Sequence, residues 1–254
     1  MAPFYVIIRT LTLTLNWRTM RRDFTDITVV MDCSGSMASC RSDAEGGLNS
    51  YIEQQKKVPG KALFSLAQFD TKYEFKYKGT PLQEVGYCTL NPGGMTALLD
   101  AVGRAITETG DRLRQMPESE RPGLVVFMII TDGQENASRE FTRHQIRQMI
   151  EHQQSKYNWQ FSYLGANQDA FAEAASYGIN LDAVANYAAA KSVSAYNSMS
   201  SNTTRMRTAT AMGLCAKSEY TADEKTDMAE DFQTASPKTW TSPGTQSTCQ
   251  STTK

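Results

Sequence analysis

The segment that most constrains the fold of this chain is Gly123–Thr131, GLVVFMIIT, in which every position from Leu124 to Ile130 is apolar. A strand with one face in water alternates apolar and polar residues, whereas a strand covered on both faces is apolar throughout. This segment is therefore predicted to be a central parallel strand with helices on both sides. A second segment, Ile27–Met31, is also strand-like and ends directly before an aspartate.

Helical and strand-like patterns alternate along the rest of the chain. Helices are expected at 48–58, after Ala97, after Thr142 and at 169–178. Gln145 completes a capping box with Thr142, and Gly178 ends the helical pattern of the last segment. Strands are expected at 27–31, 62–69, 73–78, 123–131 and 159–166. The strand at 73–78 has the alternation of an antiparallel edge strand. Together the elements predict an α/β fold, a doubly wound, mostly parallel sheet flanked by helices with one antiparallel edge strand.

Composition divides the chain into three parts. Residues 23–214 hold the predicted domain, which the alanine- and serine-rich stretch 185–212 is expected to close with a peripheral helix. Residues 1–22 form an N-terminal extension, in which the strict alternation over 10–17 is typical of a half-buried strand. This extension is expected to be either an added edge strand or a disordered segment. Residues 215–254 contain no Leu, Ile or Val and are rich in Ser, Thr and charge, so a disordered tail is predicted there.

Charge and cysteine usage exclude several classes of protein. The formal net charge is -1, so no overall basic field would draw the chain to nucleic acid or to an anionic membrane. The N-terminal apolar run is interrupted by Arg9 and is too short and too rich in threonine to span a bilayer. The five cysteines are scattered without a C-x-x-C pair, which favours a reducing, cytoplasmic location over a disulfide framework or zinc site.

Oxygen-bearing side chains follow three of the predicted core elements. In an open α/β sheet, ligands bind outside the carboxyl ends of the parallel strands, near the switch in strand order. The loop after the strand at 27–31, a Gly-Gly loop before the helix that follows Ala97, and the loop after the strand at 123–131 all reach that edge. They carry Asp32, Ser34, Ser36, Thr96 and Asp132.

This donor set suits a hard divalent cation. Two carboxylates balance its charge, and three neutral hydroxyls fill further positions without adding charge, so one more anionic ligand can come from outside. Magnesium prefers near-octahedral oxygen coordination, and manganese is also permitted by these donors. Taken singly, Asp132 could mark a turn, Thr96 a helix N-cap, and the two serines loop filler. Their order along one predicted fold makes the metal interpretation the stronger one.

The stretches VVMDCSGSM, GGMTALLDAV and FMIITDGQEN resemble the three metal-site loops of the von Willebrand factor type A (VWA) domain, over roughly residues 23–187. The resemblance implies a complete metal-ion-dependent adhesion site, with hydroxyls from Ser34, Ser36 and Thr96, and with Asp32 and Asp132 acting directly or through water. It further implies an intracellular bacterial or phage type of module whose metal accepts an Asp or Glu side chain of a protein partner. Such modules often work beside ATPases or in stress responses.

The same residues also allow an enzymatic interpretation. A magnesium site on such a sheet also suits phosphoryl transfer, so a Mg²⁺-dependent phosphoesterase is the alternative function. However, the second aspartate of haloacid-dehalogenase-like phosphatases is replaced by Ser34, and Cys33 has no arginine at the spacing of a cysteine-phosphatase loop. No G-x-S-x-G, P-loop or G-x-G-x-x-G motif is present. The sequence therefore predicts a non-catalytic binding module.

Overall fold

A computed structural model describes residues 20–166, 170–188 and 191–229 of the chain. In these ranges six strands form one sheet, with the order β3-β2-β1-β4-β5-β6. Their bounds are β1 Arg21–Asp32, β2 Lys61–Phe69, β3 Tyr73–Pro81, β4 Pro122–Thr131, β5 Gln160–Ala166 and β6 Val184–Tyr187. The strand predicted at 10–17 lies outside the described residues.

The strand β3 is the one antiparallel member of the sheet, and the other neighbouring strands pair in parallel. The predicted fold class, including the antiparallel edge strand, is therefore confirmed. The strand order reverses between β1 and β4, which lie side by side, with Met31 opposite Ile130. This switch point places the residues that follow both strands at one edge of the sheet.

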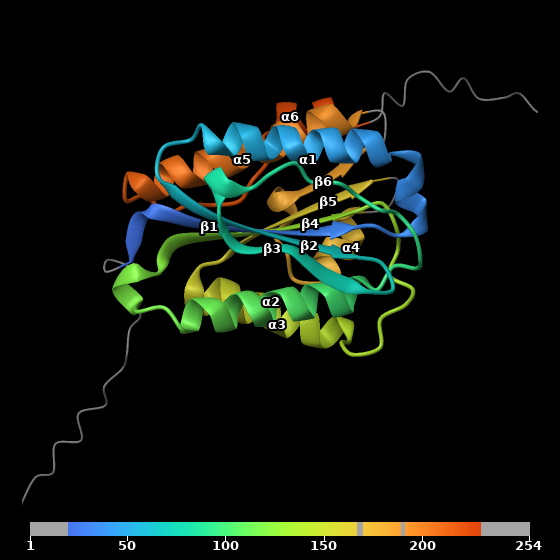
Figure 1. Cartoon of the computed structure of the whole chain (residues 1–254), viewed down its shortest axis with the longest axis horizontal. Coiled ribbons are helices and arrows are strands. Elements are labelled where there is room, and N and C mark those ends of the chain that lie inside the picture. The colour runs from blue at the N-terminus through green and yellow to red at the C-terminus, as the bar shows by residue number, and fades with distance from the viewer. Residues whose placement is uncertain (1–19, 167–169, 189–190, 230–254) are drawn as a thin grey trace, which may run out of the picture.

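Helices cover both faces of the sheet (Figure 1). On one face lie α1 (Arg41–Lys56), α5 (Ser192–Ala211) and α6 (Ala222–Met228); on the other lie α2 (Leu98–Arg114), α3 (Arg143–Tyr157) and α4 (Ala170–Ser176). Short 3-10 turns occupy η1 (Gly35–Ser39), η2 (Leu82–Glu84), η3 (Glu118–Glu120) and η4 (Leu181–Ala183). Thr142 and Gln145 form the predicted capping box at the start of α3.

The central strands contribute side chains to two separate apolar cores. Along β4, Val126 and Met128 join the core beneath α1 and α5, while Phe127 and Ile129 join the core beneath α2 and α3. All four side chains are fully buried. This two-sided burial is the physical reason why the segment carries no polar residue between Leu124 and Ile130.

The helix α5 packs against α1 and completes the first core. The approach is close, because a methyl group added to Gly47 of α1 would lie only 2.1 Å from the ring of Tyr196. Tyr196 is itself buried. The alanine- and serine-rich segment is thus a helix, as expected. Its buried face is mixed: Ala195, Tyr196, Met199 and Met206 join the core, and Ser, Thr, Asn and Arg side chains are buried beside them.

The ends of the domain differ from the predicted boundaries. The strand β1 begins at Arg21, inside the predicted extension, and the Arg21 N–H donates to the Arg121 carbonyl (3.1 Å). At the other end, residues 215–229 of the predicted tail are ordered and contain α6. They bury Tyr220 and Met228 in the first core, so an aromatic ring and a thioether replace the Leu, Ile and Val that the composition lacks. Residues 1–19 and 230–254 lie outside the described residues.

A buried ion pair fastens the sheet to α2. Asp26 of β1 is completely buried, and both of its carboxylate oxygens accept hydrogen bonds from Arg112 (2.8 and 3.0 Å). Thr28 also lies within hydrogen-bonding distance of this carboxylate (3.4 Å).

No helix within the described ranges is long and apolar enough to cross a lipid bilayer.

Candidate metal centre

Asp32 is the last residue of β1, and its carboxylate is fully buried at the switch point. Oδ1 accepts a hydrogen bond from the Ser34 N–H (2.7 Å), and Oδ2 accepts one from the hydroxyl of Thr131 (2.6 Å), the last residue of β4. Since Thr131 follows directly from the central strand, the orientation of the Asp32 carboxylate is fixed by the pairing of β1 with β4.

Ser34 and Ser36 lie in the loop that leads from β1 into η1. Their hydroxyl oxygens are 3.1 Å apart, and the Ser36 hydroxyl donates to Oδ1 of Asp132 (2.6 Å). Ser34 is buried, Asp132 is half-buried and Ser36 is exposed. The first and third loops are therefore in direct contact, and the side of the cluster formed by Ser36 and Asp132 opens to solvent.

Thr96 reaches the same cluster from the loop before α2. Its N–H donates to Oδ1 of Asn136 (2.9 Å), while the Asn136 N–H donates back to the Thr96 carbonyl (3.0 Å). A methyl group built on Gly133 would lie 3.0 Å from Oγ1 of Thr96, 3.5 Å from Oγ of Ser36 and 3.7 Å from Oδ2 of Asp32. The structure thus brings all five predicted site residues together around one point beside Gly133.

The loops that carry these residues are joined through their backbones. The Gly35 N–H donates to the Gly94 carbonyl (3.2 Å), and the Gly93 N–H donates to the Cys33 carbonyl (2.9 Å). Gly94 has a φ of 68°, and a methyl group there would lie 2.8 Å from the Thr71 hydroxyl. A glycine is required at this position both for the backbone conformation and for the close approach of the neighbouring loop.

Burial raises the pKa of Asp32 above the usual aspartate range, and the nearby charge of Asp132 raises it further, while the hydrogen bonds from Thr131 and Ser34 oppose the rise. Burial likewise raises the pKa of Asp132, against the opposing bond from Ser36. In the described part of the chain, no basic side chain is among the groups that set either pKa. The two carboxylates therefore lie close together without a positive partner, which is an arrangement that a cation would stabilise.

The candidate ligand set contains two carboxylates and three hydroxyls. Among the described residues, no group of three or more His, Cys, Asp or Glu side chains could hold a metal ion. The hydroxyls must therefore contribute to any cation site here. Such an oxygen-only set is compatible with magnesium or manganese and unsuited to zinc, which prefers nitrogen and sulfur ligands.

Three further residues support this cluster without belonging to the predicted donor set. Thr131 and Asn136 act through Asp32 and Thr96, and both lie in the stretch FMIITDGQEN, where the sequence suggested Asn136 only as a possible positioning residue beside Asp132. Glu135, which reads as an exposed acid at the start of a helix, instead lies in a loop and caps α2: its carboxylate accepts from the N–H groups of Leu99 (3.0 Å) and Ser138 (2.8 Å). A polar residue at the end of an apolar strand was the one available signal for Thr131.

The fold and the cluster define a class of protein: a doubly wound α/β domain with oxygen donors from three loops at its switch point. No protein-family model and no curated protein matches the chain. Among solved structures, the chain is similar to a von Willebrand factor type A protein from Catenulispora acidiphila, with 14% identity and a TM-score of 0.51 over 71% of this chain and 43% of that one. It is also similar to proximal thread matrix protein 1 from the mussel byssus, with 14% identity and a TM-score of 0.51 over 68% of this chain and 46% of that one.

These similarities show that the chain has the VWA fold, as the resemblance of its loops implies. The chain spans less than half the length of both of these structures. At 14% identity the similarity concerns the fold alone, so the roles of the five oxygen-bearing residues rest on the geometry of this chain.

Proposed function

We propose that this protein is a non-catalytic binding module that holds Mg²⁺ at Asp32, Ser34, Ser36, Thr96 and Asp132 and uses the ion to bind an acidic side chain of a protein partner. The observation that carries the proposal is the convergence of oxygens from three separate loops beside Gly133. A buried and a half-buried carboxylate without a basic partner add the electrostatic reason for a cation to bind.

The two carboxylates would neutralise a divalent ion, and the hydroxyls would add no further charge. A carboxylate from outside is then the ligand that such a site favours, and it would approach on the exposed side formed by Ser36 and Asp132. Met95, which precedes Thr96 and is 53% exposed, would offer adaptable apolar contact area to the partner beside the acidic side chain.

The alternative, a Mg²⁺-dependent phosphoesterase, needs a nucleophile beside the cluster. The nearest thiol is unsuited to this role, because burial raises the pKa of Cys33 to about 12 and keeps it protonated at neutral pH. A phosphoesterase would hydrolyse p-nitrophenyl phosphate in Mg²⁺ and lose that activity in Asp32→Asn. A binding module would show no magnesium-dependent turnover.

The proposal is tested by thermal unfolding of the wild type, Asp32→Ala and a control, Asp43→Ala, in EDTA, Mg²⁺ and Ca²⁺. Asp43 is an exposed acid in the first turn of α1. We expect Mg²⁺ to raise the unfolding midpoint of the wild type and of the control but not of Asp32→Ala, because a ligand that binds the native state stabilises it. An equal response of all three proteins would contradict the metal site.

The partner chemistry is tested with arrayed peptides that each carry one central Asp or Glu, compared with the same peptides carrying Asn or Gln. Capture of acidic peptides in Mg²⁺, lost in EDTA and in Asp132→Ala, is the expected result. Capture that ignores either the metal or the acidic residue would show that the module binds its partners in another way.

A further inference from the structure

Two positively charged side chains, Lys72 and Arg139, flank the loop that carries Thr96. Both residues are exposed, and within the described part of the chain neither side chain makes a hydrogen bond or an ion pair. Met95, which precedes Thr96, is 53% exposed. These three residues, Lys72, Met95 and Arg139, are called the Met95 platform, and their segments are joined by hydrogen bonds next to the candidate metal site.

Lys72 lies on the β2 side of the Thr96 loop. It belongs to the turn between β2 and β3, where its N–H donates to the Asp70 carboxylate. The hydroxyl of Thr71, the preceding residue, accepts a hydrogen bond from the Met95 N–H (2.9 Å). The turn and the Thr96 loop are therefore in direct contact, and Lys72 is one residue away from this contact.

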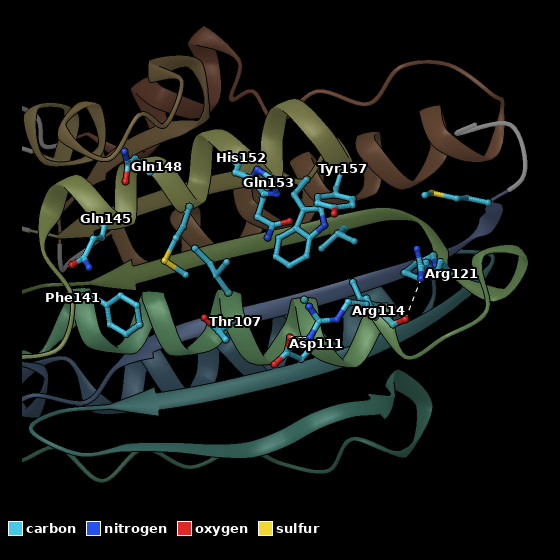
Figure 2. A pocket seen from close by; sticks show the side chains of 18 residues that line it. Thr107, Asp111, Arg114, Arg121, Phe141, Gln145, Gln148, His152, Gln153 and Tyr157 are labelled. Carbon is cyan, nitrogen blue, oxygen red and sulfur yellow. Dashed lines mark hydrogen bonds and ion pairs between the residues drawn. The ribbon is translucent and has the colours of Figure 1, made fainter. Parts of the chain in front are cut away.

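Arg139 lies on the other side of the Thr96 loop. Its N–H donates to Oδ2 of Asp100 (2.8 Å) in the first turn of α2, and the Phe141 N–H donates to Oδ1 of the same carboxylate (2.9 Å). Figure 2 shows Phe141 beside the first turns of α2. Asp100 follows Thr96 by four residues, so its hydrogen bond holds Arg139 close to the Thr96 loop.

The acidic side chains of the same segments are already used within the chain. Each of them accepts hydrogen bonds from backbone N–H groups or pairs with an arginine: Asp70, Asp100, Glu135 and Glu140. Asp43 is an exposed acid, but it belongs to α1 on the opposite face of the sheet. The charged groups beside Thr96 that can still pair with a partner are therefore Lys72 and Arg139.

A groove of about 580 Å³ between α2 and α3 offers no such charges (Figure 2). Among the charged side chains that line it, Asp111 pairs with Arg114 (2.8 Å), and Arg121 donates to the Met116 carbonyl (3.1 Å). These charges are used within the chain. The Met95 platform differs from the groove because it combines unpaired cations with an exposed apolar side chain.

We infer that the Met95 platform selects the partner of the metal site, and that this partner carries its metal-binding Asp or Glu within an acidic segment that includes apolar residues. This inference rests on the function proposed above, because the first acidic residue is the one that the ion binds. Further acidic residues pair with Lys72 and Arg139, and an apolar side chain packs on Met95. Charge complementarity of this kind adds selectivity and speeds association.

The test compares two peptides in a Gly-Ser context. Both have a central Asp between two leucines, and the second peptide also has Glu residues beyond each leucine. Fluorescence anisotropy measures the affinity of each peptide for the full chain in Mg²⁺ and in EDTA. The proteins are the wild type, the double variant Lys72→Ala/Arg139→Ala and the control Lys57→Ala/Lys217→Ala.

The control removes the same charge at the other edge of the sheet. Lys57 is exposed at the C-terminal end of α1. Lys217 is exposed next to Ser218, whose N–H donates to the side chain of Gln160 at the start of β5 (3.0 Å). Neither lysine makes an ion pair within the described ranges. An effect of net charge alone would therefore appear equally in both double variants.

In Mg²⁺, we expect the wild type and the control to bind the Glu-containing peptide about fivefold more tightly than the other peptide, an effect typical of exposed ion pairs. In Lys72→Ala/Arg139→Ala the two affinities should be equal. The wild-type preference should also disappear in about 1 M NaCl, where the screening length is about 3 Å. Met95→Ser should weaken the binding of both peptides, whereas Met212→Ser, at an exposed methionine outside the platform, should not.

The outcomes separate this inference from the proposed function. If both peptides bind only in Mg²⁺, but the preference is absent from the wild type or survives in Lys72→Ala/Arg139→Ala, the inference is overturned and the proposed function stands. Binding that ignores Mg²⁺, or no binding of either peptide, would overturn the proposed function and the inference with it. Because the double variant changes only exposed side chains, its unfolding midpoint should match that of the wild type.

Discussion

The hydroxyl of Thr131 donates a 2.6 Å hydrogen bond to Oδ2 of Asp32, and so joins the last residue of the central strand to the last residue of its neighbour. The bond is buried at both ends. It fixes one carboxylate oxygen while the other is held by the Ser34 N–H. The orientation of this candidate metal site thus depends on strand pairing as much as on the loops.

Removing this hydroxyl should weaken metal binding without unfolding the domain. We expect Thr131→Val to lower Mg²⁺ affinity roughly tenfold, since groups that orient metal ligands typically have effects of that size. Calorimetric titration with Mg²⁺ measures this change in affinity. Thr25→Val changes a buried threonine in the first half of β1, away from the cluster; it is the control and should bind Mg²⁺ as the wild type does.

The buried carboxylate of Asp32 should make the metal-free protein less stable at neutral pH. Burial raises the pKa of Asp32, so its contribution to stability is greatest below the ordinary aspartate pKa of about 3.9 and is lost as pH rises through the raised value. In EDTA, Asp32→Asn should therefore be more stable than the wild type, by a margin that grows between pH 4 and pH 7. Urea unfolding at several pH values measures the margin, and a constant or reversed difference would contradict this account.

Two adjacent glycines of α1 should respond oppositely to the same substitution. Gly47→Ala places a methyl group 2.1 Å from the Tyr196 ring and should destabilise the fold by about 3 kcal/mol. Gly46→Ala meets nothing and should stabilise it by about 0.5 to 1 kcal/mol through helix propensity. Chemical denaturation of both variants tests the close packing of α1 on α5. Equal changes in the free energy of unfolding would contradict that packing.

The ion pair between Asp26 and Arg112 should be costly to break from one side. Arg112→Met leaves the fully buried Asp26 carboxylate without its bidentate partner and should cost about 3 kcal/mol. The double variant Asp26→Leu/Arg112→Met removes both charges and should recover most of that loss. If the double variant loses as much as the sum of the two single variants, the pair is not coupled as the structure indicates.

The segment after residue 214 should contribute to stability through Met228. Met228 is fully buried, so Met228→Ala should cost about 2 to 5 kcal/mol. Met212, which is 70% exposed at the end of α5, gives the control, and Met212→Ala should change stability by less than about 0.5 kcal/mol. Equal unfolding midpoints for the two variants would contradict the burial of Met228 and would support the disordered tail that the composition predicts.

Local chemistry in the sequence was sufficient for the fold class and for the candidate site. The apolar run of β4 requires cover on both faces, and that requirement alone specifies helices on both sides of a parallel sheet. Oxygen donors directly after two such strands must meet at one edge of the sheet, so the sequence alone predicts that Asp32 and Asp132 lie together. The capping box at Thr142 was also readable, because its residues are three positions apart.

Interactions between distant segments were decided by the tertiary structure. Thr131 supports Asp32 because β4 pairs with β1, and Asn136 supports Thr96 because the third loop contacts the Thr96 backbone. Both contacts join residues that are far apart in the sequence. The order of residues 215–229 depends on a core to receive Tyr220 and Met228, and composition alone contains no information about that core. Sequence patterns report which side chains need burial; which surfaces bury them is fixed only when elements far apart in the chain pack together.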